Sequence, residues 1–176
     1  MIAVKIVGAI MILISGYMFG KHIKDDMEKR TNVISYMNRA LAYIDNKIII
    51  ENAYLEDVLI KCSEEIYKQI DIPQPFSSAS EIILDSKQNI VEAWEISTKK
   101  LYDENDFIKA EEKEYITQVG NCLSLADKDR QSEGLKAIMD SLEKIEKKAD
   151  EKAKKDGKMA MKISMICAVL LIILVI

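Results

Sequence analysis

The C-terminal stretch, from about Asp127 to Ile176, constrains this chain more than any other. No proline interrupts it, and its first half places apolar residues three and four apart. That spacing builds an apolar stripe along one face of a helix. The stripe comprises Leu135, Ile138, Leu142, Ile145, Ala149 and Ala153. Lysines then crowd the sequence up to Lys162, and no charge follows Lys162. We therefore expect one helix that begins in water, packs on a domain and ends in lipid.

A second apolar stretch opens the chain, from Ile2 to Gly20, with Lys5 as its only charge. If Lys5 snorkels to the interface, the stretch is long enough for a span of about 20 residues. A cleaved signal peptide is the alternative. However, the run ends in Tyr17-Met18-Phe19-Gly20, which lacks a small residue three before the likely cut, and most of the positive residues follow the run. We therefore expect a retained anchor. The expected membrane residues are Ile6, Phe19, Ile163 and Ile176.

Positive residues gather on the inner side of both apolar stretches. Lys21 to Arg30 follow the first stretch, and Lys152 to Lys162 precede the second. Because such residues stay in the cytoplasm, both termini should point across the membrane. The expected organisation is an N-terminal transmembrane anchor over 1–20, a cytoplasmic helical bundle over 21–158 and a C-terminal transmembrane anchor over 159–176. The protein would then pass twice through the cell membrane.

The intervening region is predicted to be helical. Six glycines and two prolines in 176 residues favour long helices over a turn-rich β fold. The expected helices run from Asp25 or Thr31 to about Ile50, from Ala53 to Ile70, from about Ser77, from Ile90 to about Leu101, from Phe107 or Ile108 to about Leu125, and from Asp127. With short connections they form an all-α antiparallel bundle of about six helices, the last continuous with the C-terminal anchor. We expect Trp94, Leu135 and Leu142 in the core, with Trp94 against the last helix.

The inventory of catalytic groups is short. His22 is the only histidine, so neither a Ser-His-Asp triad nor a histidine-rich metal site can form. No phosphate-binding glycine motif is present. The acidic residues Glu111, Glu112 and Glu114 suit a helix N-terminus, where the dipole favours negative charge. We therefore expect no enzyme activity, catalytic residue, metal or cofactor. A carboxylate–metal enzyme, or a regulator of another membrane machine, is the alternative.

Charge narrows the class of partner. Acidic residues far outnumber lysines between Glu51 and Glu114, and such a surface repels phosphate backbones. Nucleic acid is therefore not expected as a partner, nor is a small-molecule substrate. The acidic face either docks a basic protein surface or is simply solvated. The lysine-rich end of the last helix is suited to contact with anionic membrane lipids.

The segment from Gly120 to Gln131 spans a helix end, a turn and the start of the last helix. Gly120 interrupts a helical pattern at a cost of about 1 kcal/mol, which indicates a close approach of helices. Asp127 is placed to cap the last helix by accepting from backbone N–H groups near Asp129 and Arg130. Capping does not explain Gln131, so we expect its side chain to be solvated and to contact a partner. The candidate interaction residues are Gly120, Leu123, Asp127 and Gln131.

The same segment carries a family resemblance. Val119 to Asp127, followed by Gln131, resembles a motif of the stage III sporulation protein AB family of endospore-forming bacteria. Its Gly, Leu, Asp and Gln match at Gly120, Leu123, Asp127 and Gln131, while Ser124 replaces a second glycine. Ala93 and Trp94 resemble the family's Ala-Trp pair. Ala53-Tyr54-Leu55 stands where the family has Thr-Pro-Leu, so only Leu55 agrees. The two anchors extend the resemblance over nearly the whole chain.

The resemblance implies a function that the residues alone do not show. The family belongs to a multi-protein channel complex that joins the mother cell to the engulfed forespore. It resembles the cytoplasmic domain of the inner-membrane platform protein of type II secretion and type IV pilus systems. A secretion-type ATPase and other channel subunits would be the partners, with the bundle on the mother-cell side. The chain would be a non-enzymatic scaffold that receives the motion of the ATPase or holds it at the pore.

Overall fold

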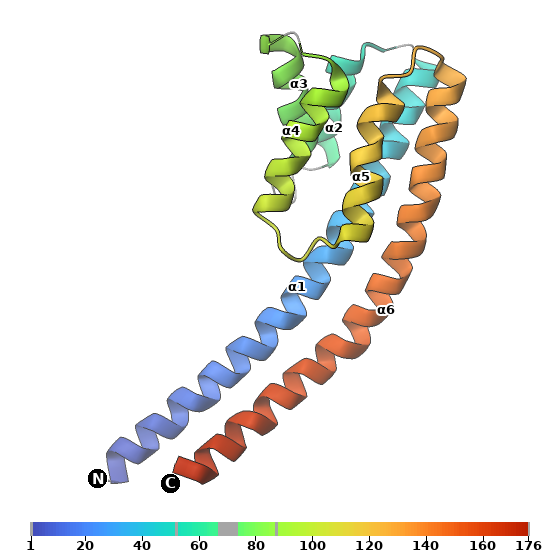
Figure 1. Ribbon diagram of the computed structural model, residues 1–176. Helices are drawn as coiled ribbons and strands as arrows, with labels where there is room; N and C mark the ends of the chain where they lie inside the picture. Colours follow the sequence, from blue (N-terminus) through green and yellow to red (C-terminus); the bar gives the residue numbers. More distant parts are fainter. Residues whose placement is uncertain (1, 52, 67–73, 87, 176) are drawn as a thin grey trace. The chain divides into compact units, whose positions relative to one another are not determined.

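The computed structural model describes residues 2–51, 53–66, 74–86 and 88–175. Six helices lie within these ranges, and the described residues contain no strand. They are α1 (Ile2–Ile50), α2 (Leu55–Ile66), α3 (Pro75–Ser86), α4 (Ile90–Asp103), α5 (Ala110–Leu123) and α6 (Lys128–Val175), shown in Figure 1. The predicted all-α class and the continuity of the last helix with the C-terminal apolar segment are confirmed.

Helix α1 is longer than the sequence predicts, because the N-terminal apolar segment and the first bundle helix form one element. The charged stretch between them contains side-chain pairs four residues apart. His22 Nε2 lies 3.4 Å from Asp26, and Lys24 Nζ lies 3.1 Å from Glu28. Pairs at this spacing stabilise a helix. A run of charges without a helix breaker therefore continues the helix instead of separating two.

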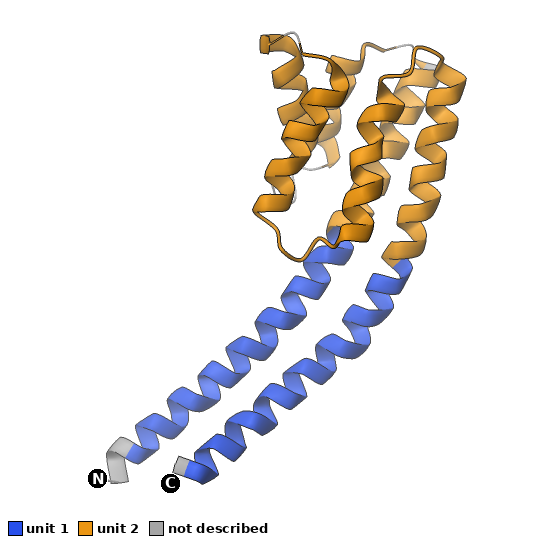
Figure 2. Cartoon of the chain, in the orientation of Figure 1, with its two compact units in different colours: residues 1–32, 147–176 blue, residues 33–146 orange. Residues whose placement is uncertain are grey.

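The chain forms two compact units, coloured separately in Figure 2. Unit 1 comprises residues 1–32 and 147–176, and unit 2 comprises residues 33–146. Helices α1 and α6 each contribute residues to both units. The predicted boundaries near residues 20 and 159 concern the membrane surface, so they stay predictions.

Apolar faces of α1 and α6 supply much of the core of unit 2. From α1, the buried residues at helical spacing are Val33, Met37, Leu41, Ile44 and Ile48. From α6, they are Leu135, Ile138, Leu142 and Ile145, with Leu135 and Leu142 fully buried. Val58, Leu59 and Cys62 of α2 are buried as well. Burial of these stripes is the main term that stabilises the bundle, since isolated helices gain little from propensity alone.

Trp94 lies at the centre of a second set of buried contacts. Its side chain is fully buried, and Nε1 donates a hydrogen bond to the Ile116 carbonyl at 2.7 Å. The Phe76 ring packs against it in a tilted arrangement, with the centroids 5.1 Å apart. These partners belong to α3 and α5, whereas the sequence predicted packing on the last helix. The difference arises because α4 lies against both α3 and α5.

Three further helices begin at other residues than the sequence predicts, and α2 begins at Leu55 instead of Ala53. Helix α3 begins at Pro75, because a proline in the first turn lacks only an N–H that has no partner in the helix. Helix α5 begins at Ala110, after a turn in which Ile108 N donates to the Asn105 carbonyl at 3.2 Å. Ile108 is buried in that turn against Val33 and Leu101. The apolar character of Ile108 thus reflects the core and not the helix. The predicted cap at residue 52 and the end of the second helix at residue 70 lie outside the described residues.

Candidate functional site

The turn between α5 and α6 is the segment that the sequence singled out, and its backbone is closed by local hydrogen bonds. Ser124 N donates to the Gly120 carbonyl at 3.1 Å, and Leu125 N donates to the Cys122 carbonyl at 3.2 Å. Ser124 Oγ donates to the Asn121 carbonyl at 2.7 Å. These bonds satisfy carbonyls that a helix C-terminus otherwise leaves without partners. The turn is therefore an ordered structure that can present side chains in a defined arrangement.

Asp127 has the geometry of a helix cap. Its Oδ1 accepts from Arg130 N at 3.0 Å, and its carbonyl accepts from Gln131 N at 3.0 Å. The Asp127 side chain is exposed. Capping of this kind satisfies an N–H of the first turn of α6 and determines where the helix begins.

Two glycines let α5 lie close to its neighbours. A Cβ at Gly120 would lie 2.9 Å from the Cβ of Trp94, which is too close for a real side chain. A Cβ at Gly134 of α6 would lie 2.8 Å from the Cys122 sulfur. The sequence indicated a close approach at Gly120, and the structure identifies Trp94 as the neighbour. Gly134 was missed, although a glycine inside the last helix was the available signal.

Gln131 is not the solvated contact that the sequence predicts. Its side chain is only 6% exposed, and Nε2 donates to the Leu123 carbonyl at 3.0 Å. The amide thus satisfies a carbonyl at the end of α5, which explains a polar residue at a buried position. Leu123 is buried too, at 4% exposure. Of the four candidate interaction residues, Gly120, Leu123 and Gln131 are buried, and only Asp127 is exposed.

Three exposed apolar residues lie at the same end of unit 2 as this turn. Lys136 Nζ lies 3.8 Å from Asp45 Oδ2, so the start of α6 runs beside the end of α1. The α1–α2 connection and the α5–α6 turn therefore lie at one end of this unit (Figure 1). The apolar corner surface comprises Ile49 (38% exposed), Tyr54 (79%) and Leu125 (43%). Sequence reasoning missed it, although a large apolar residue inside a polar turn, such as Leu125, was the available signal.

The buried titratable groups do not form a reactive centre within the described residues. Glu112 lies in the first turn of α5, at the helix N-terminus where the sequence placed it, and its side chain is fully buried. Burial, with a smaller contribution from Glu65, raises the pKa of the Cys62 thiol to about 12. A thiol with such a pKa is a poor nucleophile. Among the described residues, no group of three or more His, Cys, Asp or Glu side chains could hold a metal ion.

Unit 1 carries the expected membrane residues. Ile6, Phe19 and Ile163 expose 55%, 64% and 50% of their surface, and Ile176 lies outside the described residues. Among the described residues, α1 and α6 are the two helices long and apolar enough to cross a membrane. Large exposed apolar side chains in such segments are what a lipid environment accommodates.

The six helices and the two long apolar segments define an all-α bundle protein. Its first and last helices each contain an apolar segment of membrane-spanning length. A model of the family described as Stage III sporulation protein AB (spore_III_AB) matches residues 5–176. The chain belongs to this family, which confirms the resemblance that the sequence motifs indicated.

Two relatives agree with this assignment. The chain is similar to the Stage III sporulation protein AB of Bacillus subtilis (strain 168), with 27% identity over 172 residues, 97% of this chain and 98% of the relative. It is also similar in structure to a solved Stage III sporulation protein AB, with a TM-score of 0.63 and 23% identity. That likeness covers 71% of this chain and 96% of the solved one, and it supports the fold.

Proposed function

We propose that this protein is a non-enzymatic, membrane-anchored scaffold subunit of a secretion-like channel complex used in endospore formation. The bundle lies in the cytoplasm of the mother cell and docks a secretion-type ATPase. The observation that carries the proposal is the continuity of α1 and α6: no loop separates either apolar segment from the helix that supplies bundle residues. Membership of the sporulation family supports the setting, and the resemblance to secretion platform proteins supports the partner.

The apolar corner surface is the docking site that we propose. Tyr54 and Leu125 are large and exposed, and tyrosine is enriched among the residues that dominate binding energy at protein interfaces. The acidic side chains of Asp127 and Asp129 are exposed beside Leu125. An apolar centre with a charged rim is the usual anatomy of a protein interface. The matching surface on the ATPase is apolar at its centre and basic at its rim.

Co-purification of the full chain with the ATPase tests the proposal. Tyr54→Ala and Leu125→Ser should each weaken co-purification at least about tenfold, because truncating a residue that dominates an interface costs about 2 kcal/mol or more, and about 1.4 kcal/mol corresponds to tenfold. Both side chains are exposed enough that the fold should persist.

Leu84→Ser and Ile96→Ser are the matched controls, since these residues are 59% and 50% exposed on α3 and α4. They should leave co-purification unchanged. If the control variants lose the ATPase while the corner variants keep it, the docking site lies on the acidic helices. If no protein of this class co-purifies with the unmodified chain, the scaffold proposal fails.

A further inference from the structure

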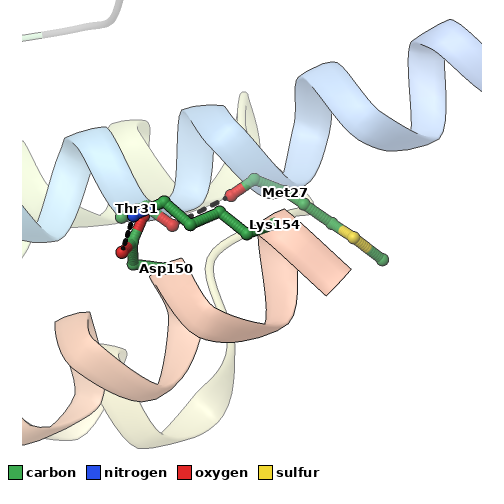
Figure 3. Close-up of polar contacts among 4 residues, drawn as sticks. All are labelled: Met27, Thr31, Asp150 and Lys154. Atoms are coloured by element: carbon green, nitrogen blue, oxygen red, sulfur yellow. Dashed lines mark hydrogen bonds and ion pairs between the residues drawn. The ribbon is translucent and has the colours of Figure 1, made fainter. Parts of the chain in front are cut away.

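Within unit 1, α1 and α6 approach each other through small residues spaced four apart. A Cβ at Gly16 would lie 2.7 Å from the Ala168 Cβ, and a Cβ at Gly20 would collide with the Ser164 hydroxyl. Small residues at this spacing let membrane helices pack backbone to backbone. Further along the pair, the Thr31–Met27 hydrogen bond and the Lys154–Asp150 ion pair are each made within one helix (Figure 3).

A groove of about 650 Å³ lies beside this close contact. Gly16 and Ala168 lie at the close contact, and larger side chains complete the lining. These include Met11, Phe19, Ile163 and Leu171. The volume is in the range of about 300–1,000 Å³ that is typical of ligand sites. In a lipid environment such an apolar groove takes up hydrocarbon.

Ile23 and Ala160 line one end of the groove, and four lysines lie within one helical turn of these two residues. They are Lys21, Lys24, Lys158 and Lys162. Lys24 Nζ lies 3.1 Å from Glu28. The other three lysines are exposed, and within the described part of the chain none has an acidic partner within 4.0 Å. Three exposed lysines without such an ion pair, at the mouth of an apolar groove, are complementary to a negatively charged headgroup that carries an apolar chain.

We propose that this groove binds an acyl chain of an anionic phospholipid, whose headgroup phosphate contacts Lys158 and Lys162. The inference rests on the membrane anchoring in the proposed function. Charge distinguishes this occupant from a transmembrane helix of a second copy, because a second copy in the same orientation brings its own lysines to the lysines of the groove. The site would hold one class of lipid against the close contact between α1 and α6.

Native mass spectrometry of the full chain in detergent, with added phosphatidylglycerol or phosphatidylcholine, tests the inference. The unmodified chain should retain phosphatidylglycerol in preference to phosphatidylcholine. Cys167→Trp, which fills the groove from an exposed position, should abolish retention, whereas Leu170→Trp, exposed outside the lining, should not. Lys158→Gln combined with Lys162→Gln should weaken phosphatidylglycerol binding at least about tenfold. Lys152→Gln combined with Lys155→Gln removes the same charge farther from the groove and should have a smaller effect.

Equal retention of both lipids, or equal loss in Cys167→Trp and Leu170→Trp, would overturn the inference. A dimer of the full chain that Cys167→Trp dissociates would also overturn it, because the groove would then hold a second copy. Carbonate washing of membranes distinguishes a failure of the lipid site from a failure of the proposed membrane anchoring. A chain that the wash extracts is not anchored, whereas a chain that stays in the membrane without selecting phosphatidylglycerol contradicts only the lipid site.

Discussion

At the scale of single residues, Gln131 shows how a buried amide joins two helices. Its Nε2 donates to the Leu123 carbonyl across the turn between α5 and α6. Gln131→Ala should lower the free energy of unfolding by about 1–3 kcal/mol, because it leaves a buried carbonyl without its donor. Chemical denaturation of a segment covering residues 21–158 measures the change. Asp129→Ala, at an exposed position in the first turn of α6, is the control and should change stability little. An unchanged midpoint for Gln131→Ala would show that the amide is solvated after all.

Trp94 is the residue whose truncation should cost most. Trp94→Ala removes the contact with Phe76 and the hydrogen bond to the Ile116 carbonyl, and leaves a cavity between α3, α4 and α5. The expected loss is about 3–5 kcal/mol in the free energy of unfolding, measured by denaturation of the same segment. Ile96→Ala, at a half-exposed position on α4, should lose far less. Similar losses for the two variants would contradict the packing around Trp94.

The roles of single residues in the turn were only partly predictable from the sequence. The cap at Asp127 follows from local chemistry, since a helix start needs an acceptor at that position. The role of Gln131 does not, because its partner carbonyl depends on how α5 and α6 pack and not on the neighbouring sequence. The exposed Leu125 is visible in the sequence only as an apolar residue in a polar turn, and its exposure depends on the same packing.

At the scale of elements, long periodic helices were predicted well and their ends less so. Helix α6 follows its apolar stripe into the apolar segment without a break. The first bundle helix was expected to begin at Asp25 or Thr31, apart from the N-terminal apolar segment, but pairs such as Lys24 with Glu28 join the two into α1. Ile108 was assigned to a helix because an apolar residue in a turn and one in a helix look alike until the core position is known.

The packing of α2 against α1 makes a prediction about pH. The Cys62 sulfur faces the Ala40 carbonyl at 3.8 Å, and burial raises the pKa of this thiol from 9.0 to about 12. Because the unfolded chain loses this proton first, stability is unaffected below about pH 9 and falls as the pH rises toward 12. The slope is about 1.4 kcal/mol per pH unit. Denaturation between pH 8 and about pH 10.5 should show a steeper decline for the unmodified segment than for Cys62→Ala. Parallel declines would contradict the burial of the thiol.

At the scale of the whole molecule, the proposed orientation predicts which side of the membrane the bundle faces. Single-cysteine variants at the exposed positions Glu81 and Glu114, in a chain without its natural cysteines, should react with a membrane-impermeant maleimide only after the cells are opened. The reason is that the proposed orientation places the lysines next to both apolar segments in the cytoplasm, as the positive-inside rule predicts. Labelling in intact cells would place the bundle outside and revive a cleaved N-terminal signal.

The docking of an ATPase on the apolar corner surface is the central claim, and site-specific photo-crosslinking tests it most directly. A photoreactive amino acid at Leu125 in the full chain, expressed in sporulating cells, should give one adduct that mass spectrometry identifies as the secretion-type ATPase. The same amino acid at Ile96, which is 50% exposed on α4 against 43% for Leu125, should give none. An ATPase adduct from position 96 but not from position 125, or adducts at 125 that contain no ATPase, would contradict the account.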